Sequence, residues 1–430
     1  MPNLYLLPIA AIAVGGAGYF FTTPPTATQS EKESQVAERS PTYSGTIAKI
    51  LNEKCVSCHR PDQAAPFSLI GYENAKRYSE MVAFATEKRR MPPWKAAPSD
   101  VEYADDGHLA ASDIALLRAW ADAGAPRGDQ SKEPAPPKFE SGWPLGKPDL
   151  VLEMPYAQTL SADGDDEYWN YVISPGNTEP IYVSALDVAP GNRRIVHHVI
   201  AFLDKSGRGK QLATGKDGDK KFGYKSRGGG VGFIPSGSLG GWAPGATNKF
   251  LPSNAGMLIE PGTDIILQVH YNKSGKEETD QTKIALYLNK EKPEREVQLA
   301  WMANPFIRIQ PGKAGQTFKQ EIPLPVSIRL YSVMPHMHLL GKAMKATAVL
   351  PDGKTIRLIE VNDWDFNWQL IYHLKQPLDL PARTKIVVEA EYDNSTDNPF
   401  QPNDPPKLVT WGEETTDEMM LLVAAYSVNR

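Results

Sequence analysis

The chain has 430 residues and a formal net charge of -5, a balance that offers no electrostatic footprint for nucleic acid. At this length about three domains are expected, and a large core can form without a disulfide framework. The 37 prolines and 34 glycines are scattered between apolar, alternating runs. That pattern is typical of a β-rich globular protein with many turns rather than of a disordered chain.

The first feature along the chain is an almost uncharged apolar segment, residues 4–21. Its length lies between that of a signal-peptide core and that of a membrane span. No Lys or Arg precedes it and no small-x-small cleavage site follows it, which favours an uncleaved membrane anchor, with a cleaved signal peptide as the alternative. We therefore assign residues 1–21 to a signal or anchor and residues 22–40 to a polar tether. A periplasmic or other extracytoplasmic location is expected, with the inner membrane as the anchoring surface.

A c-type haem attachment motif follows, Cys55-Val56-Ser57-Cys58-His59. The two thiols would bind the porphyrin covalently and His59 would ligate the iron. These are the only two cysteines of the chain. A thioredoxin-like redox pair would sit near a βαβ pattern, which this region does not show, and a simple disulfide is the other alternative. An export signal favours the haem, so one covalently attached haem c is predicted.

Helical patterns surround the motif. Residues 46–52 predict a short helix, and residues 112–124 predict an amphipathic helix that ends at Gly124. We therefore expect a small all-α cytochrome c domain over residues 41–129. The Lys-, Glu- and Pro-rich residues 130–148 predict an extended linker.

The sixth ligand of the haem iron is expected from the loop between these helices. The run Met91-Pro92-Pro93 resembles the methionine-ligand loop of small monohaem cytochromes c, so Met91 is the predicted ligand. His108 is a weaker candidate. Met81 is expected to be a core residue on its own helix.

After the linker, short β-patterned runs alternate with Pro-Gly, Asp-Gly and Asn-rich turns. They predict two all-β halves, residues 149–290 and residues 291–430. The acidic run Asp163, Asp165, Asp166 and Glu167 is expected to be a solvated turn. A calcium site is the weaker alternative, because the spacing does not match a known calcium loop.

The clearest metal-binding pattern lies in the second half. His336 and His338 are two residues apart in a strand-like run, so both side chains point to the same face. Imidazole suits copper, zinc, iron and nickel alike, and two packed histidines are the alternative. Met419 lies at the start of the last apolar run, where it is either core filler or a third ligand. Two imidazoles and one thioether would select copper.

A second group of histidines lies in the first half. His197 and His198 are adjacent, so in a regular strand they face opposite sides. Both can bind one metal only if the strand is bulged or one ring turns to use its other nitrogen. His270, in a neighbouring strand, would complete a site of three imidazoles, and Gln268 on the same face is a candidate to orient it.

Together these runs resemble the type II copper, ascorbate-dependent monooxygenases, the family of peptidylglycine hydroxylating monooxygenase and dopamine β-monooxygenase. The resemblance covers about two thirds of the chain, from near Asp149 to the end. It rests on four runs in the family's order: Val196-His197-His198-Val199, Leu267-Gln268-Val269-His270-Tyr271, His336-Met337-His338-Leu339-Leu340-Gly341-Lys342 and Thr416-Asp417-Glu418-Met419.

The resemblance implies two jelly-roll-like β-sandwich domains and two copper ions. It implies that one copper is held by His197, His198 and His270 and stores an electron. It implies that the other, held by His336, His338 and Met419, binds O2 and performs C–H hydroxylation.

Two features depart from the family pattern. Eukaryotic members carry disulfides, for which this chain has no spare cysteine. Peptide-processing members place an Arg, an Asn and a Tyr at positions occupied here by Met334, Leu421 and Val423.

The sequence thus predicts a copper monooxygenase that hydroxylates a small organic substrate with O2 and receives electrons through haem c. An ascorbate-like compound or a redox protein would be the external donor. The alternative is a non-catalytic haem and copper protein that transfers electrons or handles copper. A carrier, however, has no need of two dissimilar copper sites.

Overall fold

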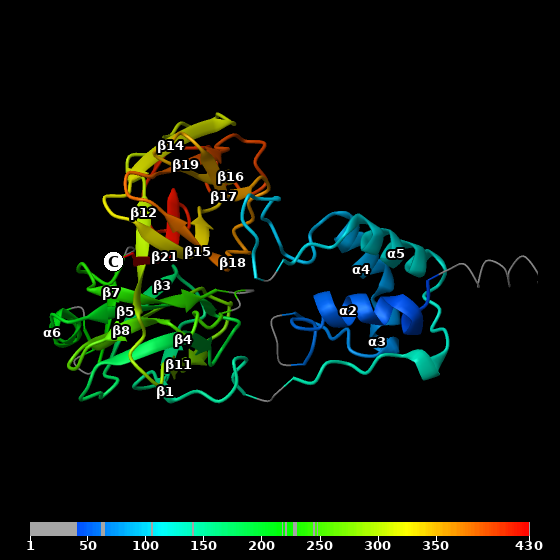
Figure 1. Ribbon diagram of the computed structural model, residues 1–430, viewed down its shortest axis with the longest axis horizontal. Coiled ribbons are helices and arrows are strands. Elements are labelled where there is room, and N and C mark those ends of the chain that lie inside the picture. Colours follow the sequence, from blue (N-terminus) through cyan, green and yellow to red (C-terminus); the bar gives the residue numbers. More distant parts are fainter. Residues whose placement is uncertain are drawn as a thin grey trace, which may run out of the picture.

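The computed structural model describes residues 41–61, 65–104, 106–139, 142–216, 218–219, 222–226, 230–243, 246 and 248–429. The predicted apolar segment 4–21 and the tether 22–40 lie outside the described residues. In the described part of the chain, no helix is long and apolar enough to cross a membrane. Figure 1 shows a helical N-terminal unit beside two β-rich halves.

The helical unit forms around a small apolar core that includes Ile47, Leu51, Leu117 and Trp120. Its elements are a π-helical turn η1 (Tyr43–Ile47), α2 (Ala48–Lys54), α3 (Tyr72–Arg77), α4 (Ser79–Glu87), α5 (Ala111–Asp122) and a 3-10 turn η2 (Gln130–Lys132). Both predicted helices are therefore present, and Gly124, with φ +77°, lies just beyond the end of α5.

The expectation that Met81 is a core residue is wrong. Its side chain is 54% exposed on α4, because the buried face of that helix is made by Ser79, Val82, Ala83 and Thr86. The predicted linker, residues 130–148, begins with the 3-10 turn η2, and its described residues after Lys132 contain no helix or strand.

The first β half runs from residue 150 to residue 288. Its elements are β1 (Leu150–Glu153), β2 (Gln158–Leu160), β3 (Glu167–Ile173), β4 (Ile181–Ala189), β5 (Val196–Asp204), α6 (Arg208–Thr214), β6 (Gly223–Ser226), β7 (Gly237–Trp242), β8 (Ala255–Ile259), β9 (Asp264–Tyr271), β10 (Glu278–Asp280) and β11 (Lys283–Leu288). Every residue of β9 is buried, because β9 lies inside the five-stranded sheet β6-β3-β9-β5-β7.

The second β half runs from residue 295 to residue 428. Its elements are β12 (Arg295–Ala303), β13 (Arg308–Ile309), β14 (Gln316–Pro323), β15 (Ile328–His336), β16 (Gly341–Val349), β17 (Thr355–Val361), β18 (Tyr372–Leu380), β19 (Lys385–Tyr392), β20 (Val409–Thr410) and β21 (Leu421–Val428). The four-stranded sheet β14-β19-β16-β17 faces strands β12, β21, β15 and β18 across an apolar core.

One sheet joins the halves. Within the described residues its order is β1-β11-β4-β8-β12-β21-β15-β18, and the two halves meet where β8 pairs with β12 in parallel. The predicted all-β halves are thus present as sandwich-like layers, and the expected boundary near residue 290 lies between β11 and β12. The continuous sheet, rather than disulfides, connects them.

Candidate metal centres

The first candidate centre lies on two neighbouring strands of the five-stranded sheet, β5 and β9. The pairing register of β5 shifts between Val196 and His198, and His198 then lies directly opposite His270. A bulge of this kind turns adjacent side chains toward one side of the sheet. It explains how His197 and His198 both approach His270, as one of the two predicted geometries requires.

The three imidazoles converge through their Nδ1 atoms. His198 Nδ1 lies 3.4 Å from His197 Nδ1 and 3.4 Å from His270 Nδ1. Two nitrogens bound to one ion at about 2.0–2.1 Å, with a near-tetrahedral angle, lie roughly 3.3–3.4 Å apart. The spacing therefore fits a site for one metal ion, and one ligand atom from each of the three residues lies within 4.8 Å of the others.

The remaining nitrogen of His270 is held by Asp166, whose Oδ2 lies 2.9 Å from Nε2. This contact fixes the ring so that Nδ1 faces the other two histidines. The sequence assigned Asp166 to a solvated turn and Gln268 to the orienting role. Asp166 is exposed in the segment before β3, as expected, but it also contacts His270. The expectation for Gln268 is wrong, because Gln268 Nε2 donates instead to Asn170 Oδ1 and to the carbonyl of Gly230.

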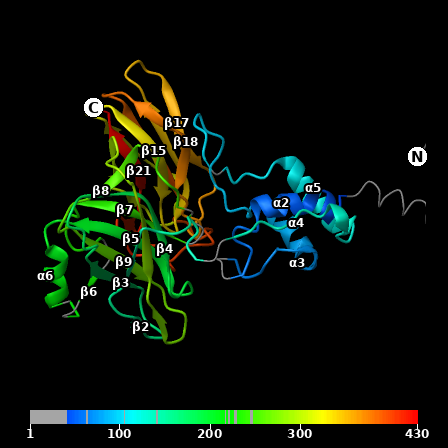
Figure 2. The ribbon, with the colours of Figure 1, turned by 60° about the horizontal axis from the view of Figure 1, so that its bottom comes forward.

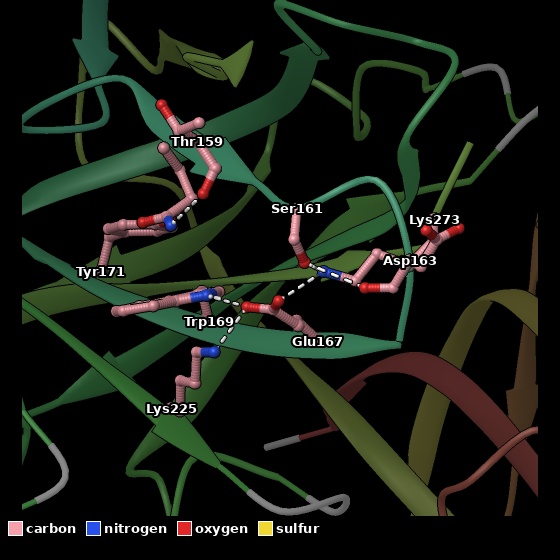
Figure 3. A network of polar contacts seen from close by, with 9 residues as sticks. Thr159, Ser161, Asp163, Glu167, Trp169, Tyr171, Lys225 and Lys273 are labelled. Atoms are coloured by element: carbon pink, nitrogen blue, oxygen red, sulfur yellow. Dashed lines mark hydrogen bonds and ion pairs between the residues drawn. The ribbon is translucent and has the colours of Figure 1, made fainter. Parts of the chain in front are cut away.

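A polar network supports the start of β3 next to Asp166 (Figure 3). Glu167 accepts hydrogen bonds from Trp169 Nε1 at 2.9 Å and from Lys273 Nζ at 2.5 Å, and Lys225 Nζ lies 2.7 Å away. Burial alone would raise the pKa of Glu167, but the hydrogen bonds from Lys225, Lys273 and Trp169 outweigh it and lower the pKa to about 2. The carboxylate thus anchors the segment that presents Asp166 to His270.

The second candidate centre lies where β15 and β21 pair. His336 is opposite Leu421 in the antiparallel register, so continuing the register by two residues sets His338 opposite Met419. The imidazoles of His336 and His338 have centroids 5.2 Å apart. Strand β15 ends at His336, so His338 lies just beyond the strand that the sequence predicted for both, and the two rings are still brought together.

Each of these two imidazoles is fixed through Nδ1, which leaves Nε2 for a metal. His336 Nδ1 lies 2.7 Å from the side-chain oxygen of Gln369, and His338 Nδ1 lies 3.2 Å from the carbonyl of Asp417. The two candidate centres therefore present different nitrogens to a metal, Nδ1 in the first and Nε2 in the second.

A buried carboxylate links the two segments that carry the second centre. Glu418 accepts hydrogen bonds from the backbone N–H groups of His338 at 2.9 Å, Leu340 at 2.6 Å and Met419 at 3.1 Å. Burial raises the pKa of Glu418 to about 8, against these backbone donors, which favour the ionised form. The contacts position His338 and Met419 relative to each other.

Both centres open into one cavity of about 730 Å³. The lining includes all three histidines of the first centre and His336, His338 and Met419 of the second. Phe366 lies between the centres: its ring stacks on His197 at a centroid distance of 5.3 Å and meets His338 edge-on at 5.8 Å.

Burial favours the neutral form of four of these imidazoles. It lowers the pKa of His197 and His336 to about 4 and that of His338 to about 3, and it lowers the pKa of His198 well below its usual value. At neutral pH each ring therefore offers an unprotonated nitrogen, which is the form that binds metal.

The haem-attachment motif lies at the end of α2. Backbone bonds from Cys58 N and His59 N to the carbonyl of Cys55 place all three residues on one turn. His59 Nδ1 lies 3.3 Å from the carbonyl of Phe67, which leaves Nε2 for iron. These residues fit a covalent haem with His59 as a ligand. Met91 is half-buried in the loop after α4, and its ligation of iron stays a prediction.

Asp166, Phe366 and Gln369 carried no local signal in the sequence. Each acts on a histidine from a different element, 104 residues away for Asp166 and 33 for Gln369. For Glu418 the sequence offered one indication of a role at the site, which is its position next to Met419.

Comparison with known proteins links one region to a family. Residues 314–426 match the family model of the copper type II ascorbate-dependent monooxygenase, C-terminal domain. No curated protein sequence matches the chain.

Solved structures with some similarity include the major capsid protein P2 of bacteriophage PM2, at 11% identity, covering 62% of this chain and 98% of that one, with a TM-score of 0.23. Another is the VP2 subviral particle of infectious bursal disease virus, at 11% identity, covering 67% and 83%, with a TM-score of 0.18. These scores are too low to indicate a shared fold.

The matched region contains His336, His338 and Met419 together with Gln369 and Glu418. The second centre therefore lies in a region that matches the C-terminal domain of copper type II ascorbate-dependent monooxygenases.

Proposed function

We propose that the protein is a copper-dependent monooxygenase that hydroxylates a C–H bond with O2, and that haem c in the same chain delivers the electrons. The observation that carries the proposal is the single cavity of about 730 Å³ into which two dissimilar sets of metal-ligating side chains open. A protein that only carries electrons or copper needs no such cavity. A cavity of this size suits a small organic substrate.

The side chains divide the work between two copper ions. His197, His198 and His270 would hold one ion through Nδ1, and His336, His338 and Met419 would hold the other through two Nε2 atoms and a thioether. Bound copper would supply one electron at each site for the reduction of O2. The thioether makes the second set selective for copper over zinc.

The cavity favours a substrate without a carboxylate near the reactive carbon. Met334, Leu421 and Val423 line it, and none has a side-chain donor. Burying a carboxylate against them costs several kcal/mol, whereas an apolar or neutral aromatic group gains about 25 cal/mol per Å² buried.

Two arginines of the second half, Arg308 and Arg329, do not supply such donors to the cavity. Arg329 is held by both oxygens of Asp379, at 2.8 and 2.5 Å. Neither Arg308 nor Arg329 is among the described residues that line the cavity.

The haem part of the proposal is supported by the Cys55, Cys58 and His59 turn. Haem c would supply single electrons, received from an ascorbate-like compound or a redox protein. Covalent attachment of this type takes place outside the cytoplasm, so we propose a periplasmic location, with residues 4–21 as an anchor or signal.

Elemental analysis and haem absorbance of the purified chain test the proposal. Two copper ions and one haem per chain are expected. His336→Ala should lose one copper and keep the haem, whereas His373→Ala, a histidine that lines the same cavity outside both sets, should keep both coppers. Zinc in place of copper, or one copper in total, would refute it.

A further inference from the structure

A segment that leaves the helical unit pairs with two edge strands of the second β half. Residues 94–104, which we call the strap, run from the helices to β17 and β18 (Figures 1 and 2). Ala97 N donates to the carbonyl of Glu360 on β17 at 2.7 Å, and Ala104 N donates to the carbonyl of His373 on β18 at 2.8 Å. Because β17 and β18 are the outer strands of their sheets, the strap pairs with both free edges.

Side chains also fix the strap in place. Ser99 Oγ donates to the carbonyl of Arg357 at 2.5 Å, and Tyr103 OH donates to the carbonyl of Leu358 at 2.7 Å. Val101 and Tyr103 pack against the apolar core of the second half. The strap is therefore part of the sandwich and not a loose tether.

The first residue of the strap, Trp94, lies close to the haem-attachment segment through a short chain of contacts. Lys54, the residue before Cys55, donates from Nζ to the carbonyl of Asp106 at 2.9 Å. Asp106 Oδ1 lies 2.6 Å from His108 Nδ1, and the His108 ring meets the Trp94 ring edge-on at 6.0 Å.

On its other side, Trp94 contacts Tyr372, which lies three residues from a partner of the second metal centre. Its ring centroid lies 5.0 Å from that of Tyr372, a side chain only 2% exposed at the start of β18. Three residues before Tyr372 is Gln369, whose oxygen lies 2.7 Å from His336 Nδ1. The path from Trp94 to His336 thus consists of one ring contact, a short stretch of backbone and one hydrogen bond.

The three-histidine centre lies farther along the same path. It contacts the segment that carries Gln369 through the ring of Phe366, which stacks on His197 at a centroid distance of 5.3 Å. Gln369 Nε2 donates a hydrogen bond of 3.0 Å to the carbonyl of Phe366. An electron that arrives through Tyr372 and Gln369 therefore meets His336 first.

We propose that Trp94 and Tyr372 form the electron path from haem c to the copper at His336, His338 and Met419, and that this copper is reduced before the one in the three-histidine centre. In the step, ferrous haem loses one electron and becomes ferric, and Cu(II) gains it and becomes Cu(I), with no bond made or broken. The inference rests on the proposed function and adds the route and its end point.

Trp94→Leu in the full-length protein tests the route. With both coppers oxidised and O2 absent, the haem is reduced by a light flash, and the decay of its ferrous absorbance is followed. Trp94→Leu should slow this decay by an order of magnitude, and Trp94→Phe, which keeps a ring, should restore most of it. Ser99→Ala, which removes a strap contact off the path, should decay at the wild-type rate. The haem reduction potential and the thermal midpoint should match wild type in each variant.

The end point is tested by removing one copper at a time. His270→Ala, which lacks the copper of the three-histidine centre, should show the wild-type decay, and His336→Ala should show a slower one. The opposite order, or an unchanged decay in Trp94→Leu with haem and both coppers present, overturns the inference alone. Purified protein without covalent haem would overturn the proposed function and the inference together.

Discussion

Replacing Gln369 by Leu removes the acceptor that lies 2.7 Å from His336 Nδ1, at nearly constant side-chain volume. Gln369 is 6% exposed, so water does not readily replace the lost oxygen. A buried donor without a partner costs about 1–3 kcal/mol. Loss of a partner that orients a metal-binding histidine weakens metal affinity by about 10–100-fold, which corresponds to about 1.4–2.8 kcal/mol. The two magnitudes agree.

The assay is a copper titration against a competing chelator, in a His270→Ala background where only the second centre remains. Gln369→Leu should bind copper about 10–100-fold more weakly, and Gln369→Glu, which keeps an oxygen acceptor, should lose less. The matched control is Gln298→Leu, because Gln298 lines the same cavity and accepts a bond from Tyr426 instead of a histidine. Unchanged copper affinity in Gln369→Leu would show that the contact does not orient His336.

Three further outcomes follow from the same contacts. Glu418→Ala leaves three buried backbone N–H groups without their acceptor and should lower the free energy of unfolding by about 3 kcal/mol or more in urea denaturation, whereas the exposed Glu414→Ala should not. Because burial lowers the pKa of His336 to about 4 and of His338 to about 3, the unfolded chain takes up these protons first. The free energy of unfolding of the metal-free protein should therefore decrease as the pH falls from about 6.5 to about 4. This decrease should be less steep in His336→Leu. Glycine-extended peptides should be poor ligands of the wild type, and Met334→Arg, which adds a donor to the cavity wall, should tighten their binding in calorimetry.

The sequence was sufficient for features that depend on local periodicity. Alternation along a strand predicted that His336 and His338 share a face, and the two rings do lie together, although β15 ends at His336 and His338 follows it. The adjacent His197 and His198 required a bulge or a turned ring, and β5 has the bulge.

Features that depend on contacts between residues far apart in the chain could not be predicted from the sequence. Asp166 looked like a solvated residue because its neighbours are acidic, yet it binds His270 across 104 residues. The strap has no alternating pattern, and its partners on β17 and β18 follow more than 250 residues later. Met81 was expected in the core because it is apolar, but it lies on the exposed face of helix α4.

The pairing that joins the two β halves could not be predicted from the sequence either. The boundary expected at residue 290 falls between β11 and β12, but β8 and β12 pair across it and make one sheet of the two halves. That contact involves only two residue pairs and is too short to leave a pattern in the sequence. Such a contact is decided by packing of the completed halves rather than by local preference.

Isotopically labelled dioxygen provides the most direct measurement of the central claim. The protein with both coppers and haem in place is reduced, supplied with neutral aromatic compounds and exposed to the labelled gas, and any hydroxylated product is analysed by mass spectrometry. The account predicts a product in which the new hydroxyl carries the label, and no such product from Met419→Leu. A hydroxyl derived from water, or no product from any neutral compound while both coppers are bound, would contradict it.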